Sequence, residues 1–195
     1  MSKYTIQSNN TKILLSETLK KLMSEKNLKK ISINEIVGRC NLNRNSFYYH
    51  FNDIYDLLKF TLDREAVNII KETNLGKDIK GAILFITNYI DKNKAFCQSA
   101  YNSLGREELK LFLKNDIQII ISNYITDILN TNNITVNDEF KNYIISVHSD
   151  LIATNLIYYL NEEFNIEKEN LINYMIILFT NSLDGTINLI INNKI

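Results

Sequence analysis

The chain has 195 residues, with 22 acidic and 22 basic side chains, 45% hydrophobic residues and two cysteines. This length allows one small domain beside a larger one, and the apolar content is sufficient for a buried core. The N-terminus lacks the apolar region of a signal peptide, and no apolar run approaches the length needed to span a bilayer. We therefore expect a cytoplasmic protein without a membrane partner. Cys40 and Cys97 do not have the spacing of metal ligands, and we expect neither a metal nor another cofactor.

The charges are unevenly distributed along the chain. Residues 1–59 contain ten Lys and Arg against five Asp and Glu, a balance of +5, whereas residues 60–195 contain twelve against seventeen, a balance of −5. An excess of positive charge at one end favours a nucleic-acid partner for that end, although a basic face can also be merely solvated.

Residues 32–51 predict two short helices around a tight turn. Ser32 and Glu35 have the spacing of a capping box, in which each side chain satisfies a backbone donor at the start of a helix. The apolar residues that follow have the i, i+3, i+4, i+7 spacing of one buried face, at Ile33, Ile36, Val37 and Cys40. The segment is therefore the first half of a helix-turn-helix.

The second helix of this pair concentrates polar and aromatic side chains. Asn43 is placed to cap it, and Phe47 and Phe51 point inward. The remaining side chains face outward or line the edges, at Arg44, Asn45, Ser46, Tyr48, Tyr49 and His50. A helix of this size fits the major groove of DNA, where its first residues reach the base edges.

This segment resembles the DNA-binding domain of TetR-type bacterial transcriptional regulators. The resemblance rests on the run from Leu42 to Phe51, on a helix that begins near Thr11, and on the Tyr55-Asp56-Leu57-Leu58 sequence that follows. It covers residues 11–58. Two positions depart from the family pattern: the turn residue that is often Gly is Asn41, and the Lys that commonly begins the fourth helix is Ile54. Asn tolerates the left-handed conformation of a turn, whereas the loss of the Lys removes a phosphate contact.

The motif predicts a DNA contact set. We expect Arg44, Asn45 and Ser46, with Asn34 of the preceding helix, to face base edges. Ser32, Tyr48, Tyr49 and His50 are expected to hold the DNA backbone, and Asn43, at the start of the recognition helix, completes the predicted DNA-binding set.

The whole chain is predicted to be all-α, because it contains no proline and only five glycines. We place a helix-turn-helix DNA-binding domain at 1–53 and a helical ligand-binding and dimerisation domain at 54–195. A first helix is expected from Thr11 to Lys26, packing through Ile13, Leu14, Leu19, Leu22 and Met23. A fourth helix from about Asn52 to Thr73 joins the domains, and five more are expected at 78–92, 94–103, 106–130, 136–161 and 166–192. Asp78, Thr135 and Asn165 stand where three of them should begin.

The last two helices predict a homodimer. They are apolar around more of their circumference than one intramolecular contact requires. The apolar positions at helical spacing are Phe140, Ile144, Val147, Leu151 and Tyr158 in the first, and Leu171, Met175, Leu178, Phe179, Ile187 and Ile190 in the second. The alternative is that both helices lie in the core of a monomer. The family resemblance also implies a dimer, which would bind a palindromic operator through two recognition helices.

A ligand cavity in the C-terminal domain is a second expectation. Its candidate walls are aromatic and polar residues, Phe85, Phe96, Tyr101, Tyr124 and His148, although aromatic residues at helical spacing also fill ordinary cores. The segment from Ala95 through Tyr101 to Gly105 and the helix after it resemble the branch of the family that includes regulators of dihydroxyacetone-kinase operons. This leaves open whether the effector is a small molecule or a protein partner.

The sequence shows no nucleophile and base pair, Gly-rich phosphate loop or metal cluster, so we expect no enzyme. The sequence predicts a sequence-specific DNA-binding transcriptional regulator whose operator affinity depends on an effector bound in the C-terminal domain. We expect this regulator to act as a repressor. The alternatives are a helix-turn-helix protein controlled by a protein partner or one that organises DNA without a small ligand, and a helical interaction module that has lost DNA binding.

Overall fold

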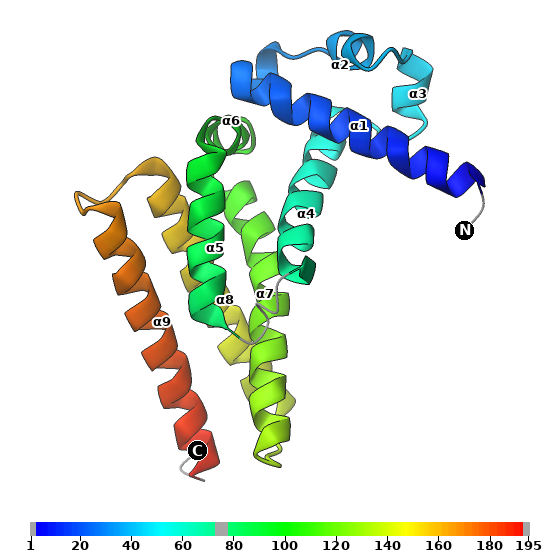
Figure 1. Cartoon of the computed structure of the whole chain (residues 1–195). Helices are drawn as coiled ribbons and strands as arrows, with labels where there is room; N and C mark the ends of the chain where they lie inside the picture. The colour runs from blue at the N-terminus through cyan, green and yellow to red at the C-terminus, as the bar shows by residue number, and fades with distance from the viewer. Residues whose placement is uncertain (1–2, 73–77, 193–195) are drawn as a thin grey trace. The chain divides into compact units, whose positions relative to one another are not determined.

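The computed structural model describes residues 3–72 and 78–192, with side chains at 8–65 and 78–192, and its regular elements in this part of the chain are all helical (Figure 1). The prediction of an all-α chain is thus confirmed. In chain order the elements are α1 (Lys3–Glu25), η1 (Leu28–Lys30), α2 (Ile33–Arg39), α3 (Arg44–Tyr48), α4 (Ile54–Glu72), α5 (Ile79–Lys92), α6 (Lys94–Leu104), α7 (Arg106–Thr131), α8 (Asp138–Asn161) and α9 (Lys168–Ile191).

The helix ends differ from the predicted ones chiefly where capping decides them. Asp78 caps α5 as predicted, because its carboxylate accepts from the Gly81 amide at 2.9 Å. In contrast, α8 is capped by Asn137, whose side chain accepts from the Glu139 amide at 2.8 Å, and α9 follows Glu167, so the predicted starts at Thr135 and Asn165 are wrong. α1 also begins earlier than Thr11, at Lys3.

The chain forms two compact units. The first unit comprises Met1–Val67 and Asn93–Gly105, and the second unit comprises Asn68–Lys92 and Arg106–Ile195. The first unit is therefore discontinuous in sequence, and α4 continues from one unit into the other.

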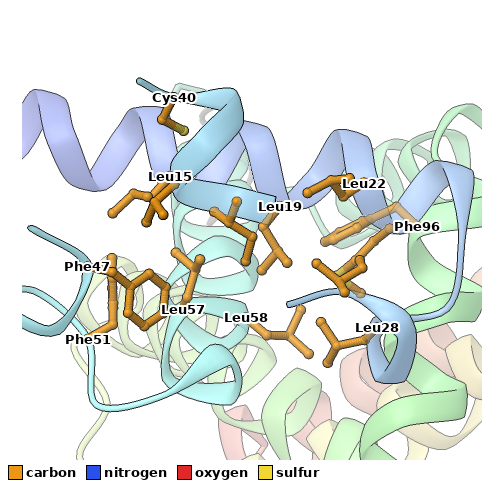
Figure 2. Packing of buried hydrophobic residues seen from close by; sticks show 14 of the residues in the cluster. Leu15, Leu19, Leu22, Leu28, Cys40, Phe47, Phe51, Leu57, Leu58 and Phe96 are labelled. Atoms are coloured by element: carbon orange, nitrogen blue, oxygen red, sulfur yellow. The ribbon is translucent and has the colours of Figure 1, made fainter. Parts of the chain in front are cut away.

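The core of the first unit lies beneath α1 (Figure 2). Leu15, Leu19 and Leu22 are fully buried there, whereas Leu14 is 42% exposed, so the expectation that Leu14 faces the core is wrong. Positions 15, 19 and 22 have the i, i+4, i+7 spacing of one helical face, and position 14 lies beside that face. The other labelled members of this core are Leu28, Cys40, Phe47, Phe51, Leu57, Leu58 and Phe96.

Helix α6 belongs to the first unit and fills its core. Phe96 and Ala100 are fully buried in the same cluster as Leu19 and Leu22 of α1, and Figure 2 shows Phe96 next to Leu22. The Lys20 ammonium lies 5.7 Å from the centre of the Phe96 ring. Phe96 is accordingly a core residue of the DNA-binding unit, which corrects its assignment to the wall of a ligand cavity.

The second unit consists of α5, α7, α8 and α9, with α4 entering it from Asn68. Helix α9 packs on α5 and α8. The buried stripe of α9 is Leu171, Met175, Phe179, Leu183, Ile187 and Ile190. Most of the apolar positions named for α9 in the dimer prediction are therefore core positions.

Helix α9 also corrects the expectation that no segment could span a bilayer. Within the described residues it is long and apolar enough to do so by length and composition. This is weak evidence for a membrane span, because a core helix of a water-soluble protein passes the same test.

Candidate nucleic-acid interface

Helix α2, the first helix of the helix-turn-helix, is capped at its N-terminus by a side chain. The Ser32 hydroxyl accepts from the Glu35 amide at 3.2 Å, as predicted. The reciprocal half of the capping box is replaced, because the Glu35 carboxylate instead accepts from the Lys26 ammonium at 2.7 and 2.8 Å. An N-cap of this kind contributes about 1 kcal/mol.

The turn between α2 and α3 is a Schellman motif at Asn41. The Leu42 amide donates to the Val37 carbonyl at 2.8 Å, and the Asn41 amide donates to the Gly38 carbonyl at 3.3 Å. Asn41 has φ of 53°, in the left-handed region that Asn adopts more readily than most residues. The replacement of the usual Gly by Asn at this turn therefore preserves its geometry.

Helix α3 begins with Asn43 as its N-cap. The side-chain oxygen of Asn43 accepts from the Ser46 amide at 2.9 Å and from the Ser46 hydroxyl at 3.2 Å. Phe47 is fully buried and anchors this short helix to the core of the first unit. The side-chain oxygen of Asn43 is therefore occupied by the cap, and its side-chain amide nitrogen remains to donate outward.

Arg44 and Tyr48 form a pair on the exposed face of α3. The Arg44 Nη2 atom donates to the Tyr48 hydroxyl at 3.0 Å, and the guanidinium carbon lies 5.6 Å from the centre of the Tyr48 ring. Residues four apart on a helix lie one above the other, so this contact stays within the helix. It holds a planar, permanently charged donor group at the surface.

Asn34 of α2 and Asn45 of α3 are exposed, as base-contacting side chains must be. Tyr49 is 70% exposed, and its ring meets the half-buried His50 ring edge-on with centroids 4.8 Å apart. Burial and the neighbouring Lys12 ammonium lower the pKa of His50 below its usual 6.5. The free protein therefore holds His50 neutral near pH 7, with one ring nitrogen that can donate.

Four basic side chains in the rest of the first unit are paired with carboxylates. The pairs are Lys20 with Glu65 at 2.6 Å, Lys26 with Glu35 at 2.7 Å, Arg39 with Glu25 at 2.8 Å and Arg64 with Glu17 at 3.0 Å. Arg44 and Lys12 contact aromatic rings instead, and these contacts leave their charges uncompensated. Arg44 thus adds a positive charge to the exposed face of α3, and Lys12 adds a second one beside Phe51, which follows this helix. Lys12 is absent from the set predicted from sequence, because its place beside Phe51 is set by tertiary packing.

The five residues proposed to line a cavity are divided between the two units. Phe96 and Tyr101 lie on α6 in the first unit, whereas Phe85, Tyr124 and His148 lie in the second. Phe85 is 37% exposed. The Tyr124 hydroxyl donates to the Asp184 carboxylate at 3.0 Å, and burial together with that carboxylate raises the pKa of Tyr124 to about 12.

His148 has partners on two helices. Its Nδ1 lies 2.9 Å from the Ile144 carbonyl, which can only accept, so Nδ1 carries the proton. The other ring nitrogen, Nε2, lies 3.2 Å from the Ser182 hydroxyl of α9. Among the residues with described side chains, no group of three or more His, Cys, Asp or Glu comes together to hold a metal ion.

The capped pair of short helices, with a cationic exposed face on the second, defines a helix-turn-helix DNA-binding protein. Residues 15–59 match the family model described as bacterial regulatory proteins of the tetR family, and residues 77–181 match a model described as the C-terminal region of a transcriptional regulator. The second match alone covers more than half of the chain. The chain belongs to the TetR family of bacterial transcriptional regulators.

The chain is also similar to two regulators described as DhaS. The chain is 22% identical over 91 residues to the HTH-type dhaKLM operon transcriptional activator DhaS of Lactococcus lactis subsp. lactis (strain IL1403), an alignment that covers 47% of this chain and 49% of the relative. The solved structure of a dihydroxyacetone kinase operon activator DhaS has the same fold, with a TM-score of 0.68 and 17% identity over 89% of this chain and 96% of that one. The family assignment makes the chain a DNA-binding regulator with a helical C-terminal regulatory region.

Proposed function

We propose that the protein binds a palindromic operator as a homodimer, and that an effector acting on its second unit controls operator affinity. The DNA-binding part of this proposal is supported by the contact between Arg44 and Tyr48, which holds the Arg44 guanidinium on the exposed face of the capped helix α3. We place the protein in the cytoplasm, where a regulator of this family meets the chromosome.

In this proposal Arg44 selects a base. Its guanidinium can donate two hydrogen bonds to the O6 and N7 atoms of one guanine, a contact worth about 1 to 3 kcal/mol of discrimination. Asn45, Ser46 and Asn34 complete the base-facing set, and their exposed or half-buried positions are compatible with that role. The backbone contacts are assigned to Ser32, Tyr48, Tyr49 and His50.

The dimer is proposed to form through α8 and α9. Both helices carry exposed apolar side chains that are separate from their buried stripes, at Tyr143 (65%), Val147 (43%), Tyr174 (55%), Ile177 (57%) and Leu178 (50%). Association of two copies would remove this surface from water, which favours a two-fold interface. Phe179, which is 1% exposed, belongs to the core instead.

The effector is proposed to act through helices that connect the units. α4 runs from the first unit into the second, and α6 packs in the first unit while its flanking helices α5 and α7 belong to the second. An effector that favours one arrangement of these helices would change the spacing of the two recognition helices, which must match major grooves about 34 to 36 Å apart. A coupling of this kind is typically about 1 to 3 kcal/mol.

The nature of the effector separates two versions of the proposal. A small molecule would have to displace or extend the bonds made by Tyr124 and His148, which bind Asp184 and Ser182 in the described structure. A protein co-regulator would need no such cavity. Repression follows where the operator overlaps the promoter, whereas the relative described above is named an activator, and a promoter fusion measures which outcome applies.

The test begins with selection of duplexes from a random-sequence library by the wild-type protein. Titration of the selected duplex and its single-base-pair variants then measures affinity and sequence preference. For Arg44→Ala we expect an affinity loss of about 1 to 3 kcal/mol and a flattened preference at one base pair of each half-site.

Lys30→Ala is the matched control, because Lys30 is an exposed cation of the first unit outside the recognition helix. We expect it to leave the preference unchanged. If Arg44→Ala kept the full preference of the wild type, the assignment of Arg44 to a base would be wrong. If the wild type enriched no sequence from the library, the proposal of a specific operator would fail.

A further inference from the structure

Lys12 of α1 is held next to the end of the recognition helix. Its ammonium lies 6.0 Å from the centre of the Phe51 ring and 5.8 Å from the centre of the Phe60 ring. Phe51 is buried in the core of the first unit, and Phe60 packs against the same core. The ammonium group is therefore positioned over two fixed rings, although lysine otherwise has a flexible side chain.

His50 is the ionisable neighbour of Lys12. The His50 ring lies 6.4 Å from the Phe51 ring, centre to centre, so both groups flank the same aromatic side chain. Their electrostatic coupling is repulsive when both are charged. In the free protein the site consists of the Lys12 ammonium and the His50 imidazole. The ammonium of Lys12 contacts two aromatic rings, whereas four other cations of this unit contact carboxylates.

We propose that Lys12 and His50 together bind one phosphate of the DNA backbone at the end of the recognition helix. The inference rests on the proposed DNA contact map and adds a contact from α1, outside the helix-turn-helix. A phosphate placed between the two groups would accept from the ammonium and from the imidazole, and its negative charge would relieve the repulsion between them. DNA is the occupant that the adjoining recognition helix brings to this position.

A phosphate contact has a measurable consequence that a packing role for Lys12 does not. Each cation that neutralises a phosphate of B-DNA contributes about 0.9 to the slope of log K against log of the salt concentration. Two copies of Lys12 in a dimer would therefore contribute about 1.8. Sequence preference should not change, because a phosphate carries no base information.

The experiment titrates the library-selected duplex with wild-type protein and with Lys12→Gln over a range of KCl concentrations. We expect the slope to become shallower by about 1.8 in the dimer, with the ranking of base-pair variants retained. Lys12→Arg keeps the charge and should keep the wild-type slope. Lys21→Gln is the matched control: Lys21 is exposed on the same helix, nine residues away and thus on the opposite face.

The shared phosphate is tested by combining Lys12→Gln with His50→Gln. If both groups hold one phosphate, the double variant loses less affinity than the sum of the two single losses, because the first substitution already weakens the contact of the second. Additive losses would overturn the shared site. An unchanged salt slope in Lys12→Gln, with sequence-selective binding intact, would overturn the role of Lys12 while leaving the proposed function standing. Absence of selective binding by the wild type would count against the proposed function itself.

Discussion

At the scale of single residues, the proposed DNA-binding surface combines side chains that are already held in place in the free protein. Arg44 is held by Tyr48 within α3, and Lys12 is held by Phe51 and Phe60 across the core. Ordering these side chains in advance reduces the rotamer entropy lost on binding. The contact between Arg44 and Tyr48 also links a residue proposed to face a base to one proposed to face the DNA backbone, so a Tyr48 substitution should affect both proposed roles.

His50 predicts a pH dependence of DNA binding. Burial and Lys12 lower its pKa in the free protein, whereas a phosphate next to the ring favours the imidazolium and raises the pKa in the complex. Binding should therefore take up protons, and operator affinity should rise as the pH falls from about 8 to about 6. Titrations of the selected duplex at constant ionic strength measure this rise, and His50→Gln should flatten it. An equally steep pH profile in the variant would assign the proton uptake to another group.

The lowered pKa of His50 predicts that acidification destabilises the free protein, although it should strengthen DNA binding. The unfolded chain binds a proton at His50 more readily than the folded chain does, because the folded pKa is lowered. The contribution of His50 to stability is therefore full above the unfolded pKa of about 6.5 and is lost as the pH falls from there through the lowered folded pKa. Acidification should thus tighten DNA binding while it reduces the free energy of unfolding.

At the scale of elements, the reactivity of Cys97 in α6 measures how closely this helix is packed. Burial raises the pKa of Cys97 to about 12, so the thiol is protonated at pH 8. A shift of this size from the ordinary value of 9.0 lowers the thiolate fraction roughly 1,000-fold. Alkylation of Cys97 by iodoacetamide, followed on its own peptide by mass spectrometry, should be slow in the native protein and fast in denaturant.

An effector that moves α6 away from α1 should accelerate this labelling. Cys40 is the internal control: it is buried beneath α1, where its thiol donates to the Thr18 hydroxyl at 3.1 Å, and its labelling should stay slow. Rapid labelling of Cys97 in the native protein without any effector would contradict the packing of α6 described here.

Helix positions were predictable from the sequence, whereas the packing of α6 was not. The apolar spacing and the absence of proline place α5 to α9 close to their observed ends, because these signals are local. The start of α8 after Asn137 was missed because Asn and Thr residues just before it could cap a helix equally well, and that of α9 was missed because Glu167 makes no side-chain cap. The burial of Phe96 against α1 depends on contacts distant in sequence, and an aromatic residue at helical spacing does not reveal its partner.

The exposure of the proposed DNA-contacting side chains around α3 was predictable from the local pattern of polar and aromatic residues. Arg44, Tyr48 and Tyr49 are exposed as expected, and Asn43 caps α3 as expected. Lys12 lies 39 residues before Phe51 in the sequence and could be associated with it only in the folded chain.

At the scale of the whole molecule, the exposed apolar surface of α8 and α9 predicts the effect of charge on assembly. Leu178→Glu places a carboxylate on the proposed interface, where a partner would bury it without a counter-ion. Sedimentation should show a dimer for the wild type and a monomer for the variant at micromolar concentration. Loss of the second half-site should weaken operator binding by about 100-fold or more.

Leu111→Glu is the control for this experiment, because Leu111 is 58% exposed on α7, outside the two helices of the proposed interface. It should remain dimeric. A wild-type monomer, or a dimer that survives Leu178→Glu, would contradict the assignment of the interface to α8 and α9. Circular dichroism of both variants checks that the helices are retained.

The discontinuity of the first unit determines how this protein could be recombined with others. A DNA-binding fragment cut within α4 would lose α6, and with it the Phe96 and Ala100 side chains that complete the core around Leu19 and Leu22. Such a fragment would expose apolar surface and lose part of its stabilisation. A chimaera that exchanges operator specificity should therefore carry α6 from the same parent as the helix-turn-helix. The part of the chain that must be exchanged as a whole is thus the first unit, which includes Asn93–Gly105 from between the two segments of the second unit.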